Sequence, residues 1–179
     1  QSPNGNLVVA VHIDDHIGYD LDVEEKPILR EARLSLRLEG LELGRNPKLM
    51  RTATRAHDET LRPVVRQKAA TLRDRYNELR LEFEGGYAVV FRAYDEGVAY
   101  RWETSLAQAE VKVIGEEALF NFTGDHFVYY PEEQSFYSHN ERLFLPRALG
   151  DLSAGHLASL PAVVDAGGVQ IAIADAAVE

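Results

Sequence analysis

The sequence predicts an all-β protein, a large antiparallel β-sandwich. Along most of the chain apolar and polar residues alternate with a period of two, which is typical of strands with one buried and one solvated face. Glycine and acidic turn signals interrupt this alternation at short intervals. Only residues 66–76 have a helical composition, and since they lack a capping box and a clear apolar stripe we assign them to a loop. Many strands separated by turns favour packed sheets.

The first strands follow each other closely. Residues 7–13 (LVVAVHI) and 17–23 (IGYDLDV) flank a turn at 14–15. The apolar residues of the second run share one face, and its two acids share the other, so we expect a sheet with one wet side. After a second turn at 24–27, residues 34–43 continue the alternation.

The clearest pattern is a three-stranded antiparallel meander within residues 77–103. Its first strand alternates leucine and phenylalanine with charged residues up to the pair Gly85-Gly86, which is a hairpin signal. Residues 87–94 are apolar on both sides, as expected of a central strand. A turn at 95–97 leads into a third alternating strand, residues 98–103.

The remaining segments are less regular. Residues 44–63 are polar and uneven, and we predict a long excursion there. A second excursion lies between Pro146 and Pro161, and two short strands are predicted at 110–113 and 118–122. Long loops on a rigid sheet are common places for binding sites.

Composition excludes several function classes. The chain has 179 residues, of which 45% are hydrophobic and 27% charged, as in one globular domain. Its 29 acids against 19 bases give a net charge of −10, and no basic stripe is present, which argues against a nucleic-acid partner. With no cysteine there is no disulfide framework and no thiol nucleophile. No apolar run reaches membrane-spanning length, so no membrane insertion is expected.

Three places carry chemistry-bearing residues. The run Asp14-Asp15-His16 has metal-ligand types, but we favour a hairpin turn there because aspartate tolerates turn dihedrals. Gly124-Asp125-His126 precedes the aromatic run 127–137, which would stack on sugar rings or pack in a core. Asp175 follows the predicted strand 169–173 among alanines, where a solvent-facing strand end is the plain alternative. No G-x-S-x-G or H-E-x-x-H motif occurs.

Several segments together resemble the N-terminal domain of glycoside hydrolase family 97, and the resemblance covers essentially the whole chain. It is weakest between residues 44 and 65. The segments that carry it are SPNGNLVVAVHI (2–13), DRYNELRLEF (74–83), VVFRAYDEGVAYRWE (89–103), FTGD (122–125), SHNERLFLPRALGDLSAGHLASLPAVVDAGG (138–168) and VQIAIADAAVE (169–179).

The resemblance implies an α-glycosidase, chiefly an α-glucosidase or α-galactosidase, that is periplasmic or secreted in bacteria. Residues 1–179 would form a single N-terminal sandwich of the galactose-mutarotase-like type, a supersandwich. A (β/α)8 barrel would follow and hold the catalytic carboxylates, so no catalytic residue is expected in this chain. The partners implied are that barrel, on which the sandwich packs, and an oligo- or polysaccharide substrate.

The resemblance also implies a calcium ion at the active site. The family's sandwich contributes a glutamate near the end of its last strand, in a motif like Thr-Glu-Ala-Asp-Leu. The matching run is Ala174-Asp175-Ala176-Ala177-Val178, which puts Asp175 at the metal-ligand position. Aspartate is one methylene shorter than the family's glutamate, so ligation requires a closer backbone or a bridging water.

Two other functions stay open at this stage. A stand-alone carbohydrate-binding module would use the aromatic run 127–137 and would bind sugar by itself. An aldose epimerase, suggested by the implied fold alone, would need a histidine and a glutamate in one cleft. The histidines available for it are His12, His16, His57, His126, His139 and His156.

Overall fold

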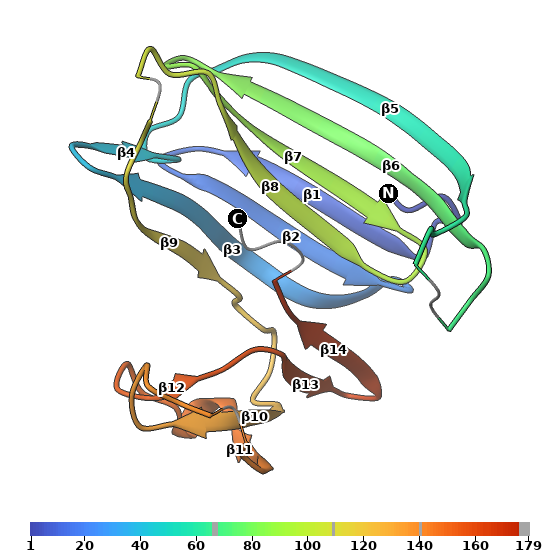
Figure 1. The fold of residues 1–179 in the computed structure, drawn as a ribbon, viewed down its shortest axis with the longest axis vertical. Coiled ribbons are helices and arrows are strands. Elements are labelled where there is room, and N and C mark those ends of the chain that lie inside the picture. Colours follow the sequence, from blue (N-terminus) through green and yellow to red (C-terminus); the bar gives the residue numbers. More distant parts are fainter. Residues whose placement is uncertain (66–67, 109, 140, 176–179) are drawn as a thin grey trace. The chain divides into compact units, whose positions relative to one another are not determined.

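The computed structural model describes residues 1–65, 68–108, 110–139 and 141–175. The chain divides into two compact units, Gln1–Asn121 and the part from Phe122 onward, which are considered separately (Figure 1). Strands in antiparallel sheets and one 3-10 turn, η1 (Leu149–Asp151), make up its regular structure, which confirms the all-β prediction. A single domain over residues 1–179 stays a prediction. Within the described residues, no helix has the length and apolarity needed to cross a membrane.

The first unit contains two antiparallel sheets. One has the order β1-β2-β3-β4, with β9 also paired to β3, and the other has the order β5-β6-β7-β8. The strands are β1 (Leu7–Ile13), β2 (Ile17–Val23), β3 (Lys26–Leu38), β4 (Leu41–Leu43), β5 (Leu49–Leu61), β6 (Leu72–Phe83), β7 (Tyr87–Tyr94), β8 (Val98–Thr104) and β9 (Val113–Leu119).

The meander predicted within 77–103 is confirmed as β6, β7 and β8. As expected, β7 is the central strand, paired on both edges and buried on both faces through most of its length. The β6–β7 hairpin pairs Phe83 with Tyr87, so its loop has three residues, of which Gly85 and Gly86 have positive φ angles of 96° and 75°. This backbone conformation favours glycine, which explains the pair.

The two sheets of the first unit pack face to face over an apolar core. Ile17 and Leu34, which pair between β2 and β3, are fully buried. Tyr19 of β2 meets Phe91 of β7 with ring centroids 5.7 Å apart. At Gly44 the chain passes so close that a Cβ atom would lie 2.7 Å from the Leu34 carbonyl oxygen. Only glycine fits there.

Two sequence-based predictions for the first unit are wrong. The excursion predicted at 44–63 contains β5, a strand of 13 residues. It is an edge strand, exposed along nearly its whole length, so burial has not selected an alternating apolar pattern. Of the loop predicted at 66–76, residues 66–67 lie outside the described residues, and β6 begins at Leu72. There Arg73 donates two hydrogen bonds to Asp58 of β5, at 2.9 and 2.7 Å, so cross-strand charges replace an apolar pattern.

A third correction concerns the strands expected at 110–113 and 118–122. A single strand, β9, starts at the last residue of the first expected strand, extends into the second, and pairs with β3. Beyond its end, the Asn121 carbonyl accepts a hydrogen bond from the Arg30 amide at 3.0 Å. Because most residues of β9 are exposed, its sequence lacks the apolar–polar alternation that would identify a strand.

The second unit is one antiparallel sheet with the order β11-β10-β13-β14, with β12 paired to β10. Val128, Tyr130 and Val164 form its buried core, against which Phe122, Leu149 and Ile173 pack. The predicted last strand is confirmed as β14. The strands are β10 (Phe127–Glu133), β11 (Phe144–Ala148), β12 (Leu157–Ala158), β13 (Ala162–Ala166) and β14 (Val169–Ile173).

Candidate functional site

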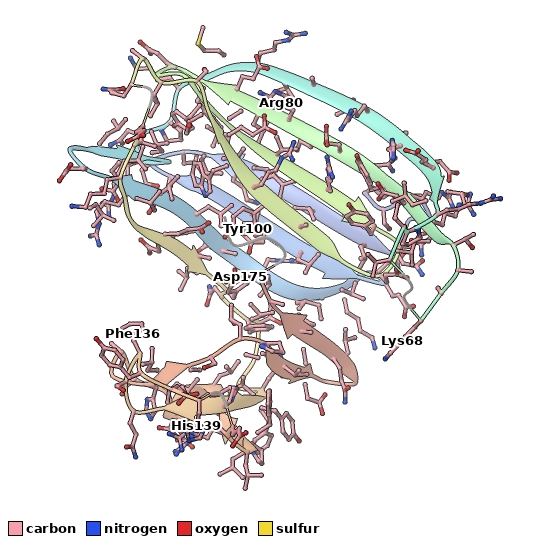
Figure 2. The ribbon with its side chains drawn as sticks, viewed as in Figure 1. Lys68, Arg80, Tyr100, Phe136, His139 and Asp175 are labelled. Carbon is pink, nitrogen blue, oxygen red and sulfur yellow. The ribbon has the colours of Figure 1, made fainter. Side chains whose placement is uncertain are left out.

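Asp175 lies two residues beyond the end of β14 (Figure 2). Its side chain is exposed, and no hydrogen bond or ion pair joins it to another residue in the described part of the chain. The last strand ends before it because Ile173 is the final residue paired with β13. Residues 176–178 of the matching motif lie outside the described residues. The Asp175 carboxylate is therefore accessible to a ligand. It lies on a short segment that follows the last paired strand.

Asp175 would be a solitary metal ligand among the residues that the structure describes. Among the described residues no group of three or more His, Cys, Asp or Glu side chains could hold a metal ion. The run Asp14-Asp15-His16 forms the predicted turn instead. There the Asp14 amide donates to the His16 carbonyl at 3.2 Å, and the His16 ring contacts the Asp15 carboxylate. A cation at Asp175 would need its other ligands from outside residues 1–175.

The acid of Gly124-Asp125-His126 has a structural role. Its carboxylate accepts a hydrogen bond from the Gly150 amide at 2.8 Å, which holds the start of the 3-10 turn η1. The His126 ring packs edge-on against Phe122.

The aromatic run 127–137 does not form one surface. In β10, Val128 and Tyr130 point into the core, whereas Phe127 and Tyr129 lie on the opposite face and are exposed. Phe136, on the loop that follows, is 92% exposed. Because side chains alternate between the two faces of a strand, part of the run packs in the core and part is exposed to solvent. The core-packing interpretation therefore holds for some of these residues, and the exposed ones remain available for stacking.

The second unit has two apolar sheet faces. Strand pairing puts a further set of residues on the face opposite the core, and we call this set the outer apolar face. It contains Phe127, Tyr129, Phe144, Pro146, Val163 and Ala172. Asp165 and Gln170 are its polar members. An antiparallel sheet normally leaves one face wet and polar, so a face of this composition is suited to contact with protein.

A buried carboxylate organises the loop between β10 and β11. Glu133 is 7% exposed and accepts hydrogen bonds from Ser159 Oγ at 3.0 Å and Arg142 Nε at 3.2 Å. A side-chain hydrogen bond from Ser138 lowers the pKa of Glu133, and those from Arg142 and Ser159 lower it further. The loop that exposes Phe136 is therefore tied to the sheet by an ionised side chain, which nothing in the sequence indicates.

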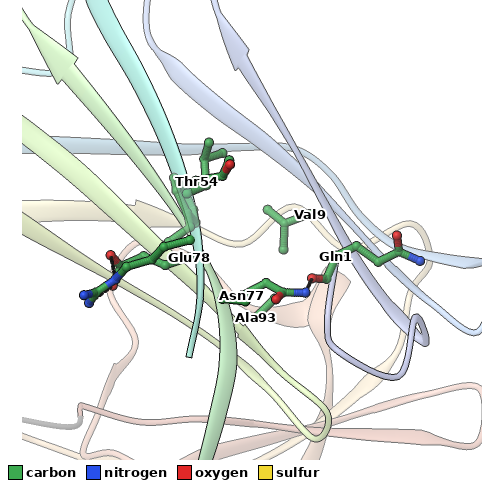
Figure 3. A pocket seen from close by; sticks show the side chains of 10 residues that line it. Gln1, Val9, Thr54, Asn77, Glu78 and Ala93 are labelled. Atoms are coloured by element: carbon green, nitrogen blue, oxygen red, sulfur yellow. Dashed lines mark hydrogen bonds and ion pairs between the residues drawn. The ribbon is translucent and has the colours of Figure 1, made fainter. Parts of the chain in front are cut away.

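The first unit contains a cavity of about 520 Å³ between β1, β5, β6 and β7 (Figure 3). Asn77 on its wall donates a hydrogen bond to the Gln1 carbonyl at 2.8 Å. Glu78 is held by Arg55 at 2.6 Å and Arg92 at 2.8 Å. Burial opposes ionisation of Glu78, but the hydrogen bonds from both arginines outweigh it and lower its pKa. These polar groups of the wall already have partners inside the protein.

The histidines do not gather into a catalytic pair. His12 contacts Asp20 at 3.2 Å and His57 contacts Asp74 at 3.4 Å, on different sheets of the first unit. His156 approaches Glu132 at 3.9 Å in the second unit. In the described residues, no histidine lines the 520 Å³ cavity of the first unit or a smaller cavity in the second unit. The epimerase interpretation receives no support from this arrangement.

Comparison with known proteins gives consistent matches. The family model described as "Glycosyl-hydrolase 97 N-terminal" matches residues 1–179. A retaining alpha-galactosidase of Bacteroides thetaiotaomicron is 32% identical over 189 residues, covering 99% of this chain and 28% of that protein. The chain thus spans less than a third of the length of this relative.

Solved structures show the same fold. A glycoside hydrolase family 97 enzyme from Pseudoalteromonas sp. strain K8, in complex with acarbose, superposes with a TM-score of 0.83 at 20% identity, covering 96% of this chain and 27% of that chain. A crystal structure of a beta-arabinopyranosidase superposes with a TM-score of 0.81 at 22% identity, covering 93% and 29% respectively.

Proposed function

The chain belongs to the glycosyl-hydrolase 97 N-terminal family, and on that basis we propose that it is the accessory β-domain of a longer, calcium-dependent α-glycosidase. The 32% identity to a retaining alpha-galactosidase supports this proposal and favours α-galactosides over α-glucosides as substrates. Because the chain matches 28% of that relative, catalysis would belong to a barrel outside these residues. The proposal includes the family's supersandwich architecture and a periplasmic or secreted location.

The domain's first role would be to pack on the barrel. The outer apolar face of the second unit is suited to this, since Phe127 and Phe144 are 55% and 46% exposed there. Burying such side chains stabilises an interface by roughly 1.5–3 kcal/mol each. In the longer protein we expect this face to be covered.

The domain's second role would be to supply a carboxylate to calcium. The observation that carries this role is the Asp175 carboxylate next to the end of the last strand, which is exposed and has no partner among the described residues. Calcium takes six to eight oxygen ligands and accepts them from separate segments, so one aspartate fits a site completed by another domain. When bound, the ion would polarise a substrate oxygen or orient the catalytic carboxylates.

The first test is the intact mass of the protein from its native source. A mass several times the 20.0 kDa of this chain is expected, and a mass near 20.0 kDa would contradict the proposal. In the longer enzyme, Asp175→Ala should lower calcium affinity and activity together. Asp151→Ala, which removes an exposed acid of the same unit, is the matched control and should change neither. Unchanged calcium affinity in Asp175→Ala would exclude the ligand role.

A further inference from the structure

Strand β5 forms an edge of its sheet in the first unit (Figure 1). It pairs with β6 along one side, and no described strand pairs with its other side. A free edge of this length presents a row of backbone N–H and C=O groups that can pair with another strand. Bulges and prolines protect many such edges, but β5 contains no proline, and its one register shift lies at its start, between Leu49 and Arg51. The rest of the edge is therefore suited to a partner strand.

The charges of β5 are divided between its two halves. Arg51 and Arg55 lie in the first half, and Asp58 and Glu59 lie in the second. When two copies of a strand pair antiparallel, each half lies opposite the other half of its partner. Self-pairing of β5 in this direction therefore brings opposite charges together, whereas a parallel pairing would bring like charges together.

Glu59 lies in a local excess of negative charge. It is directly opposite Asp74 of β6, on the same sheet face. Among the described residues, the one basic group within ion-pair distance of either carboxylate is His57, whose Nε2 lies 3.6 Å from Glu59 and 3.4 Å from Asp74. Even a protonated His57 would leave one negative charge over, and like charges directly opposite each other destabilise a sheet. The other charged residues at this end lie on the opposite face and pair with one another, namely Asp58, Arg73 and Arg75.

Arg55 lies in a local excess of positive charge on the same face. Arg55 and Arg92 share the single carboxylate of Glu78, at 2.6 and 2.8 Å, so this group of three side chains carries one positive charge more than it balances. The Arg55 side chain is 57% exposed. A guanidinium has five donor hydrogens, so Arg55 keeps donors beyond those that it gives to Glu78 and to the Tyr76 hydroxyl. The exposed groups at Arg55 and Glu59 are therefore complementary in charge.

Backbone geometry limits how two copies of β5 can pair. Along a free edge every second residue points its N–H and C=O outward, so only registers that pair odd-numbered with odd-numbered residues are possible. Two such registers bring an arginine opposite a glutamate. One places Arg55 opposite Arg55 of the second copy and includes the register shift at Arg51. The other is centred on His57, pairs Arg55 with Glu59 twice, and places no two fixed like charges opposite each other.

We propose that β5 is a self-association edge, at which two copies of this chain pair antiparallel about a two-fold axis at His57. Arg55 of each copy binds Glu59 of the other, so the local charge excesses offset each other at both contacts. Thr54 lies opposite Thr60 of the second copy, and cross-strand threonine pairs stabilise a sheet. Each His57 ring remains stacked on Tyr76 of its own sheet, at 4.8 Å between centroids. The interface belongs to the first unit, so it goes beyond the accessory role proposed above.

The test is sedimentation equilibrium of the 179-residue chain over a series of protein concentrations. It should show a monomer in equilibrium with a dimer of twice 20.0 kDa. Glu59→Arg places arginines opposite each other at both contacts and should weaken dimerisation by about tenfold or more. Glu96→Arg makes the same charge change on the turn between β7 and β8, so it is the matched control and should keep the wild-type dissociation constant.

A mixture of two variants tests the pairing itself. Arg55→Glu places acids opposite each other at both contacts, so it should weaken dimerisation as Glu59→Arg does. When the two variants are mixed, both contacts again join opposite charges, and dimerisation should return. Thermal transitions check the folding of each variant. Glu59→Arg relieves the repulsion with Asp74, so its transition should not fall, and it tests the proposal by itself if Arg55→Glu is unstable without its bond to Glu78.

Four results would overturn the proposal. The first is a monomer at every concentration, and the second is an unchanged dissociation constant in Glu59→Arg. The third is loss of the dimer in Phe127→Ser, which would assign self-association to the outer apolar face. The fourth is a monomeric longer enzyme, which would show that a segment of its own chain covers β5. None of these results bears on the calcium titration of the longer enzyme, so the two proposals fail separately.

Discussion

Tyr19 of β2 and Phe91 of β7 meet across the two sheets of the first unit with their ring centroids 5.7 Å apart and their planes inclined by 58°. Both side chains are buried; the sequence predicts the inward face of the strand that carries Tyr19, and it predicts a central strand, apolar on both sides, for Phe91. This contact joins the two sheets through residues that are 72 positions apart (91 − 19). It therefore tests whether the two sheets fold together.

Phe91→Ala should destabilise the first unit by about 3 kcal/mol, the lower end of the range for a buried phenylalanine. The lower end applies because Phe91 also lines the larger cavity, so part of its ring already lacks neighbours. Urea unfolding followed by the fluorescence of Trp102, the one tryptophan of the chain, measures this change. Phe136→Ala is the control, and equal losses in the two variants would contradict the packing described.

Gly44→Ala should destabilise the protein more than Gly40→Ala. Both glycines have positive φ angles, 88° and 78°, so an alanine at either costs about 1–2 kcal/mol in backbone strain. At Gly44 the new Cβ would also lie 2.7 Å from a backbone oxygen and 3.0 Å from Trp102, whereas at Gly40 nothing lies within 4 Å. We expect an additional 1–3 kcal/mol or so at Gly44. Thermal melts of both variants compare them directly.

Glu78→Gln should lower stability at neutral pH by about 1–2 kcal/mol, a moderate value because Arg55 is largely exposed. The pKa of Glu78 is lowered below its ordinary 4.5, since its arginine hydrogen bonds outweigh burial. The contribution of ionised Glu78 to the free energy of unfolding is therefore fully present above pH 4.5, and it is lost as the pH falls through the lowered pKa. The difference between wild type and Glu78→Gln should shrink over that acidic window.

The control for this pH series is Glu39→Gln, which removes an exposed acid paired with Lys112 at 3.5 Å. Its stability should follow the wild-type curve within a few tenths of a kcal/mol. A Glu78→Gln curve parallel to wild type from neutral to acidic pH would show that Glu78 is not stabilised as an anion.

Asp175→Glu in the longer enzyme should retain calcium binding, because it keeps the carboxylate, lengthens the reach by one methylene and is the residue that the family resemblance leads us to expect at this position. Asp175→Asn keeps the size and one oxygen ligand but removes the charge, so its calcium affinity should fall. Calorimetric calcium titrations compare the three proteins. Equal affinities of all three would show that the carboxylate at this position does not contact the ion.

Phe127→Ser should have effects of different size in the two forms of the protein. In the 179-residue chain the side chain lies on the outer apolar face, so its removal should change stability by less than about 0.5 kcal/mol. In the longer enzyme, a serine at the proposed barrel interface should cost more than about 1.5 kcal/mol. Thermal unfolding of both forms distinguishes these cases, and equally small losses would place the barrel on another surface.

The sequence by itself determined the elements in which burial imposes a period. β2, β6 and β7 bury side chains on one or two faces, and β14 alternates half-buried with exposed residues, so alternation or apolar continuity identifies them. The glycine pair at 85–86 identifies a hairpin because its positive φ angles exclude most other residues. The family, and with it the candidate ligand Asp175, also follows from local segments, since motif residues keep their order in the chain.

Only the tertiary structure decided the rest. The edge strand β5 is exposed on nearly all positions, so its existence depends on hydrogen bonds to β6 and not on any pattern of its own. The Tyr130 hydroxyl, which has no partner among the described residues, and the buried Glu133 carboxylate are likewise invisible in the sequence. Whether a buried polar group has a hydrogen-bond partner depends on which distant residues surround it in the fold. A sequence pattern shows the periodicity of a strand but not which residues lie close together in space.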